Sequence, residues 1–206
     1  MATSRRTHGR SALSKGHAEA RQSRRRGPTL ETALLDAAWD ELQAVGYANV
    51  TMDGVAARAG TSKSVLYRRW PNRAQLVIAA MRQHGGSIAD RPPDTGDLRA
   101  DVRAVLRHMR DRFKQIGADT VQGLIAELDD LPRDAFQITP DLITTILQRA
   151  AARGQARPDR ISPRIAAVPG DLIRHQMIAT RKPVTDRYID QILDEVFLPL
   201  VQPERR

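Results

Sequence analysis

Residues 34–76 read LLDAAWDELQAVGYANVTMDGVAARAGTSKSVLYRRWPNRAQL, and the pattern of this stretch decides the fold. Its first apolar residues recur at i, i+3, i+4 and i+7, which is the spacing of one face of an α-helix. Gly46 follows them and ends the helix, because glycine adopts the left-handed backbone of a helix C-terminus without strain. We therefore expect an amphipathic helix from about Thr29 to just before Gly46. The residues of its apolar face are Leu35, Ala38, Trp39 and Leu42.

Three further helices are predicted by the same stretch. Thr51 can cap the second helix, whose apolar positions repeat the helical spacing up to a glycine. Ser62 can cap a short third helix, which Pro71 ends. Asn72 opens a fourth helix that runs to about His84. The apolar face of the second helix consists of Met52, Val55, Ala56 and Ala59.

The second and third helices are joined by the tight turn Ala59-Gly60-Thr61, the arrangement of a helix-turn-helix. In such a unit the second helix presents its outer face to the major groove of double-stranded DNA. Leu66 and Trp70 share the inner face here, so small and polar side chains face outward. Cations on that face can bond phosphates or guanine edges, and hydroxyls can donate to phosphates. The outward residues are Lys63, Ser64, Tyr67 and Arg68.

This stretch resembles the DNA-binding domain of the TetR family of transcriptional regulators. The matching residues are, in order, Gly46-Tyr47, Thr51, Val55-Ala56, Ala59-Gly60, Ser62-Lys63, Leu66-Tyr67, Trp70, Arg73 and Leu76. Three positions depart from the usual pattern: Thr61 stands where an apolar residue is commoner, Ser64 where glycine is common, and Arg73 where lysine is usual. None of the three removes the motif.

The resemblance implies phosphate contacts at Thr51, Tyr67 and Arg73 and places further residues near the base edges. Thr51 has an alternative role as a helix cap alone. Tyr47 and Trp70 are interpreted as core residues. The residues placed near base edges are Ser62, Lys63, Ser64, Val65 and Arg68.

Basic residues are concentrated at the N-terminus. The net charge is +9, and residues 1–28 contribute eight basic side chains against one acid. We expect residues 1–28 to be a disordered basic arm that binds nucleic acid, with a solvated tail as the alternative. Residues 29–84 then form the helix-turn-helix domain, and residues 98–201 form a second domain. A linker rich in glycine, proline and aspartate, residues 87–97, separates them.

Helical signals continue through the second domain. Thr139-Pro140 and Ser162-Pro163 each read as a cap followed by proline at the first helical position. Thr185 can begin the last helix, which extends to about Leu198. Apolar spacing marks two more helices, and no period-2 run of strand length occurs. We therefore expect an all-α fold of about nine helices, with a bend at Pro169-Gly170.

Residues 98–201 also resemble, more loosely, one branch of TetR-type regulatory domains. The resemblance implies a ligand-sensing bundle and a homodimer joined through its last two long helices. It predicts a repressor that binds a palindromic operator and is released by an unknown small-molecule effector. The last helix carries an apolar stripe wide enough to face both the core and a twin subunit. In the alternative interpretation, the whole stripe packs against the core of its own chain. The stripe contains Tyr188, Ile189, Ile192, Leu193, Val196 and Phe197, with the seam centred on Ile189, Ile192, Leu193 and Val196.

Candidates for the effector pocket come from the apolar and aromatic side chains of this domain. Each of them also fits a plain core role, and His175 fits a hydrogen-bonded structural histidine. The candidates are Met109, Phe113, Phe136, Leu147, His175 and Met177.

Other functions are disfavoured. The chain has no cysteine, so disulfides and thiolate metal sites are excluded. Residues 2–29 lack an apolar run and no stretch is long enough to span a bilayer, so we expect a cytoplasmic protein. His108 and Asp111 lack a third ligand, and no phosphate loop or nucleophile elbow occurs, so we expect no metal, cofactor or enzymatic activity. The remaining alternative is a sequence-nonspecific architectural DNA-binding protein, which the arm favours and the near-neutral body disfavours.

Overall fold

The N-terminal helices begin and end close to the positions that the sequence predicts. The computed structural model describes residues 27–85, 88, 92–127 and 138–203. The first helix starts two residues earlier than expected, because Pro28 fits the first turn of a helix. The elements of this unit are α2 (Gly27–Val45), the 3-10 turn η1 (Tyr47–Asn49), α3 (Met52–Arg58), α4 (Lys63–Tyr67) and α5 (Arg73–His84).

Side-chain caps fix the starts of α3 and α5. Thr51 and Asn72 each accept a hydrogen bond from the backbone N–H three residues on, at 3.0 and 2.8 Å. Both predicted caps are confirmed. Ser62 stands at the cap position of α4 without a capping bond, and its Oγ lies 2.9 Å from the Oγ of Ser64 instead.

The C-terminal unit is also helical, and the described residues contain no strand. Its first elements are α6 (Leu98–Ile116), α7 (Ala118–Ala126), α8 (Ile138–Ala152), the 3-10 turn η3 (Pro158–Arg160) and α9 (Pro163–Thr180). The last helix has three contiguous parts, α10 (Asp186–Gln191), the π-helical η4 (Ile192–Phe197) and α11 (Leu198–Val201). Counted with this last helix as one, the described residues form nine helices. The prediction of an all-α fold with about nine helices is confirmed.

Two of the predicted helix starts in this unit are capped as expected. Ser162 and Thr185 accept backbone hydrogen bonds at 3.3 and 3.2 Å. Thr139 was expected at a cap but lies inside α8. Pro169 is buried inside α9, which continues on both sides of it.

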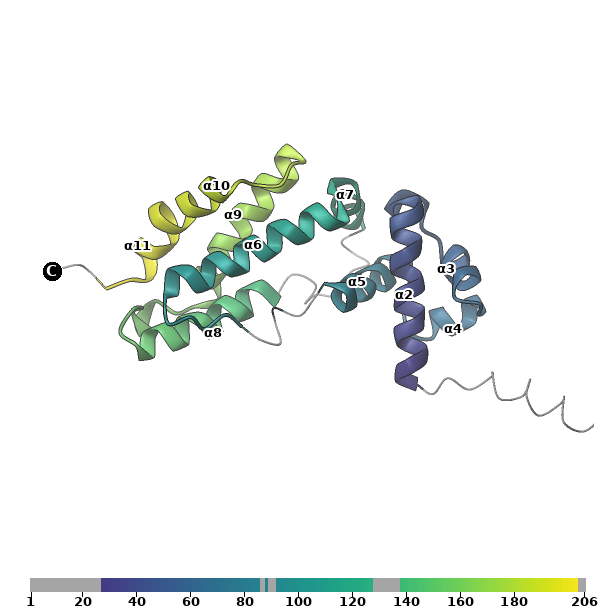
Figure 1. Cartoon of the computed structure of the whole chain (residues 1–206), viewed down its shortest axis with the longest axis horizontal. Helices are drawn as coiled ribbons and strands as arrows, with labels where there is room; N and C mark the ends of the chain where they lie inside the picture. Colours follow the sequence, from purple (N-terminus) through teal and green to yellow (C-terminus); the bar gives the residue numbers. More distant parts are fainter. Residues whose placement is uncertain (1–26, 86–87, 89–91, 128–137, 204–206) are drawn as a thin grey trace, which may run out of the picture.

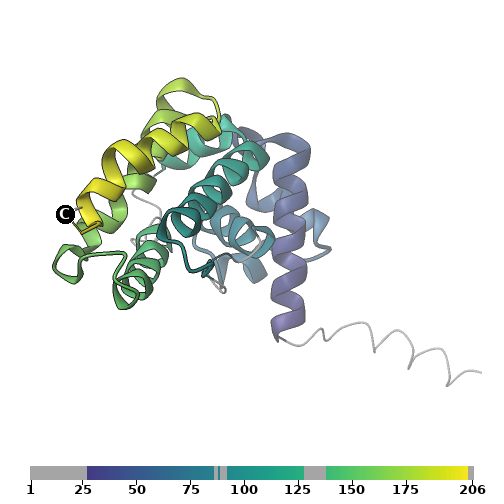
Figure 2. The same ribbon diagram turned by 60° about the vertical axis from the view of Figure 1, so that its left-hand side comes forward.

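The two units lie at opposite ends of the molecule and meet at α7 and at the C-terminal end of α6, where Arg112 Nη2 donates to the carbonyl oxygen of Met81 at 2.7 Å and Ile116 packs against the N-terminal core. Figure 1 shows α2–α5 at one end and α8–α11 at the other, and in Figure 2 the end of the yellow C-terminal helix marked C and the purple α2 lie on opposite sides. Each unit has its own apolar core. Leu124 of α7 is only 6% exposed and belongs to the N-terminal core, whereas Val121 packs against the C-terminal one. α7 therefore contributes to both cores.

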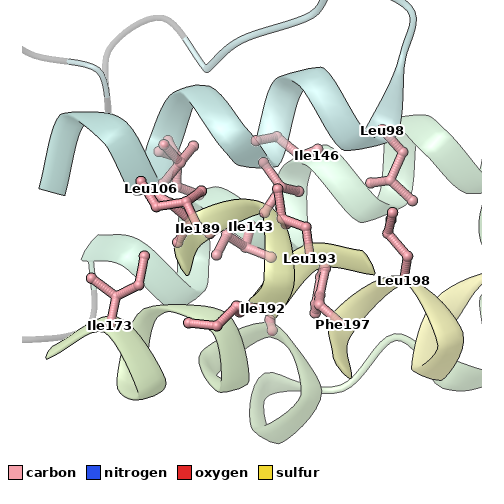
Figure 3. Close-up of a cluster of buried hydrophobic side chains, with 14 of the residues drawn as sticks. Leu98, Leu106, Ile143, Ile146, Ile173, Ile189, Ile192, Leu193, Phe197 and Leu198 are labelled. Carbon is pink, nitrogen blue, oxygen red and sulfur yellow. The ribbon is translucent and has the colours of Figure 1, made fainter. Parts of the chain in front are cut away.

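The apolar stripe of the last helix faces inward over most of its width. Ile189, Ile192 and Leu193 are buried in the C-terminal core, where Figure 3 shows them among side chains of α6, α8 and α9. Their predicted place at the centre of a subunit seam is therefore wrong, because the chain's own core already covers them. Val196 and Leu200 remain exposed on this helix, at 39% and 41%.

A ladder of ion pairs ties the last helix to α6. Arginines at every third or fourth position of α6 face aspartates spaced four apart on the last helix, and the two helices pair in antiparallel order. Arg99 Nε lies 2.7 Å from Asp194, and Arg103 Nε lies 2.7 Å from Asp190. Asp186 forms ion pairs with both Arg107 and Arg110. The ladder fixes the register of the last helix against the domain.

The ladder predicts a loss of stability in acid. Hydrogen bonds from Arg110, Arg103 and Arg99 lower the pKa values of Asp186, Asp190 and Asp194, respectively. A lowered folded-state pKa stabilises the fold above the ordinary aspartate pKa of about 3.9, and this contribution disappears as the pH falls through the lowered value. Urea unfolding of the wild type should therefore show a lower free energy of unfolding at pH 3 than at pH 6.

Asp190→Asn isolates the contribution of the ladder. The variant should be less stable than the wild type at pH 6, and its loss between pH 6 and pH 3 should be smaller, because one of the titrating carboxylates is gone. Equal pH dependence in the two proteins would contradict a role for this aspartate.

Candidate nucleic-acid interface

The outer face of α4 is a surface of cations and hydroxyls held on an apolar anchor. Leu66 is 0% exposed and Trp70 is 8% exposed, so both pack inward as predicted. Tyr67 is 52% exposed, the highest value among the exposed large apolar or aromatic residues of the described chain. The other exposed side chains of this face are Ser62, Lys63, Ser64, Arg68 and Arg69, with Val65 half-buried beside them. We call these residues, with Tyr67, the α4 surface.

Arg69 belongs to the α4 surface although the sequence pattern did not predict it. The outward residues predicted from helical spacing ended at Arg68, but the helix ends at Tyr67 and the backbone turn after it leaves both arginines exposed. The doubled arginine was the signal that could have identified it.

Thr51 lies at the start of α3 and combines two predicted roles. Its Oγ1 accepts the capping bond from the N–H of Gly54, and the residue is exposed. Accepting this bond uses a lone pair of the hydroxyl oxygen and leaves its hydrogen available as a donor. The cap and a phosphate contact are therefore chemically compatible at this position.

Lys63 is paired with an acid of the preceding helix. Its Nζ lies 2.6 Å from Asp53 Oδ1, with both side chains more than half exposed. An ion pair this exposed contributes little to stability. A phosphate can therefore replace Asp53 as the partner of the ammonium group at small cost.

Arg73 forms its hydrogen bonds with residues outside the α4 surface. Its guanidinium bonds Glu127 at the end of α7, with Nη2 2.5 Å from Oε1, and Nη1 donates to the carbonyls of Ala48 and Val50. It also lies 5.0 Å from the ring centroid of Tyr47, whose hydroxyl donates to Glu127 at 2.9 Å. In this structure Arg73 thus binds the second unit, and its phosphate contact stays a prediction.

The electrostatics of this cluster follow from its burial. Hydrogen bonds from Arg73 and Tyr47 lower the pKa of Glu127 against the effect of partial burial. Burial is the main cause that raises the pKa of Tyr47, with Glu127 adding to it. Glu127 is therefore ionised and Tyr47 neutral near pH 7. Sequence reasoning missed Glu127, because 54 residues separate it from Arg73. The interpretation of Tyr47 as a core residue is confirmed, since it is 3% exposed.

The structure brings four of the predicted effector contacts together. Phe113, Leu147 and Met177 belong to the C-terminal core, and Met109 packs against it. His175 is exposed and does not join them, because it lies two residues before Met177 and hence on nearly the opposite side of α9. Phe136 lies outside the described residues. A role for these side chains in ligand binding stays a prediction.

The described residues give no support to the alternative that the protein holds a metal ion. They contain no group of three or more side chains that could hold a metal ion. The His108–Asp111 pair noted in the sequence has another use, since Asp111 binds Arg110 at 3.0 Å. Burial lowers the pKa of His108, with help from Arg112. Within the described ranges, no helix has the length and hydropathy needed to cross a membrane.

A helix-turn-helix with an exposed basic reading face, joined to a separate helical domain, defines a DNA-binding transcriptional regulator. Comparison with known families agrees with this class. Residues 34–80 match the family described as bacterial regulatory proteins, tetR family, and residues 92–196 match the tetracyclin repressor-like C-terminal domain. The chain belongs to the TetR family of bacterial transcriptional regulators. The proteins of this family are regulators that bind DNA rather than enzymes.

Individual relatives and solved structures extend over nearly the whole chain. A DNA-binding transcriptional repressor TetR of Mycobacteroides abscessus is 35% identical over 88% of this chain and 98% of its own length. The crystal structure of the TetR family transcription regulator SCO0332 superposes with a TM-score of 0.63 at 25% identity, covering 84% of this chain and 99% of that one. A SmeT–triclosan complex shares the fold, with a TM-score of 0.53 at 17% identity over 85% and 92% of the two chains.

Proposed function

We propose that this regulator is a repressor that binds a palindromic operator as a homodimer and is released from it by a small molecule. The observation that carries the DNA-binding part is the α4 surface, where cations and hydroxyls stand outward over the buried Leu66 and Trp70. We assign base-edge contacts to Ser62, Lys63, Ser64, Val65 and Arg68, and phosphate contacts to Thr51, Tyr67 and Arg73. The repressor role is supported by the Mycobacteroides abscessus relative, which is named a repressor.

The test of this function is selection of double-stranded DNA by the full-length protein from a random-sequence library. We expect an enriched palindrome whose half-sites lie about 34–36 Å apart, or a multiple of that distance, because two-fold related helices must enter successive major-groove turns. The alternative is a sequence-nonspecific architectural protein. That alternative predicts no enriched motif, and it predicts that unrelated DNA competes as well as the bound duplex itself at every concentration. Of the predicted basic arm, residues 1–28, the first 26 lie outside the described residues, whereas Gly27 and Pro28 belong to α2.

A dimer seam is supported by the exposed apolar residues of the last two long helices. Leu172 of α9 is 36% exposed, and Val196 and Leu200 of the last helix are similarly exposed. Val196 and Leu200 are four residues apart and therefore share a helix face. We centre the proposed seam on these three residues and no longer on Ile189, Ile192 and Leu193, which are buried in the core.

The effector proposal places a small molecule within residues 98–201. Its support is the solved complex of a TetR-fold protein with triclosan and the apolar character of the surrounding core. An effector that binds only the DNA-free state must raise the melting temperature of the free protein and weaken its DNA binding by linked amounts. A metabolite library screened by thermal shift should yield such a compound. If every compound that raises the melting temperature left DNA affinity unchanged, release by a ligand would be refuted.

A further inference from the structure

The contact between Arg73 and Glu127 joins the DNA-binding unit to the regulatory unit through a single carboxylate. Nε and Nη2 of Arg73 donate to Glu127, while Nη1 donates to the carbonyl oxygens of Val50 and Ala48 at 3.2 and 3.4 Å. All three nitrogens are therefore engaged. A guanidinium held in this way has no face left for bidentate binding of a second anion.

The helix that carries Glu127 is held in place by other contacts. Leu124 is buried in the N-terminal core, and Gly123 lies against the ring of Tyr47 so closely that a Cβ there would be 2.3 Å from Cδ1. These apolar contacts do not involve the carboxylate. The Glu127 side chain can therefore lose Arg73 without α7 leaving the DNA-binding unit.

We propose that Glu127 is an internal competitor of the DNA backbone for Arg73. The inference rests on the proposed function, in which Arg73, four residues after the end of the α4 surface, contacts a phosphate. One guanidinium cannot satisfy the carboxylate and a phosphate in the same geometry, so the structure shown here is the form in which Arg73 is withheld. The position of the C-terminal end of α7 then changes DNA affinity through Arg73.

Competition predicts tighter DNA binding when the carboxylate is removed. Glu127→Gln keeps the size of the side chain and an acceptor for the Tyr47 hydroxyl, but it loses the charge that holds Arg73. A partly exposed ion pair corresponds to roughly a threefold effect for each subunit, and hence to about tenfold for a dimer. Glu127→Asp should also tighten binding, because it shortens the carboxylate by one methylene while keeping the net charge. The probe is the duplex that the wild-type protein selects from the random library, measured by fluorescence anisotropy.

Three controls test whether the effect of Glu127 depends on Arg73. The gain from Glu127→Gln should vanish in an Arg73→Gln background, which a double-mutant cycle detects. Asp141→Asn removes one exposed acid from α8 in the same unit and should leave affinity within about twofold of the wild type, the range expected for a surface charge. Circular dichroism should show the same helix content in every variant.

Three results would contradict the proposal, and each points to a different explanation. Unchanged or weaker binding by Glu127→Gln would mean that the carboxylate positions Arg73 for DNA or serves the fold alone. A gain that persists without Arg73, or that Asp141→Asn reproduces, would reduce the effect to net charge. A wild-type protein that selects no duplex would overturn the proposed function itself, and with it this inference.

Discussion

Replacing both Lys63 and Arg68 with alanine should weaken binding to the selected operator by about 10³-fold. A dimer brings two copies of the α4 surface to the DNA, so the double variant removes four cationic contacts. Contacts of this kind contribute at least about 1 kcal/mol each, or about 4 kcal/mol together, and each 1.4 kcal/mol is a factor of ten. The measurement is a titration of operator duplex at fixed salt concentration, because phosphate contacts make affinity depend on salt.

The fold should survive this change. Both side chains are exposed, and the ion pair of Lys63 with Asp53 is exposed as well. Circular dichroism and thermal unfolding should therefore match the wild type. The control is Arg164→Ala with Lys182→Ala, which removes the same charge from exposed positions of the C-terminal unit. Operator affinity of the double variant within a few-fold of this control would refute the assignment of the α4 surface to DNA.

The second large effect is expected at the proposed dimer seam. Val196→Glu combined with Leu200→Glu should convert the protein from twice the chain mass to the chain mass of 22.9 kDa in multi-angle light scattering at micromolar concentration. In a two-fold interface each residue meets the same surface of its partner, so four new carboxylates would face one another without cations. Burying unpaired charges costs several kcal/mol.

Loss of the dimer should also abolish tight operator binding. A dimer binds its second half-site as an intramolecular event, which typically contributes 10²- to 10⁴-fold in affinity. The monomeric variant should therefore bind at least about 100-fold more weakly. Val45→Glu is the matched control, since Val45 is 38% exposed but lies on α2, far from the last helix. A wild type that is monomeric at micromolar concentration, or a glutamate variant that remains dimeric, would exclude this seam.

Local signals in the sequence predicted the helices well, and they did so for identifiable reasons. Caps at Thr51, Asn72, Ser162 and Thr185 depend on a side chain and a backbone N–H three residues away. Such contacts are visible in any short stretch of sequence. The same holds for the inward direction of Leu66 and Trp70, because helical periodicity alone determines which residues share a face.

Contacts between distant segments were beyond the reach of periodicity. The stripe on the last helix was recognised as apolar, but its spacing does not say whether the chain itself or a partner covers Ile189 and Leu193. The pairing of Arg73 with Glu127 depends on how α7 docks on the DNA-binding unit. Arginine is a reasonable phosphate ligand at such a position, and no local pattern shows that an acid of another unit already holds it.

The place of Leu124 affects how proteins of this architecture can be recombined. Because this side chain of α7 fills part of the N-terminal core, a fragment ending at the conventional boundary after α5 carries an incomplete interior. A chimera that joins this DNA-binding unit to a foreign sensor would need a helix that supplies an equivalent leucine and leaves room for Tyr47, as Gly123 does. Exchange of modules is therefore constrained at α7, because a cut in the linker leaves the DNA-binding unit without part of its core.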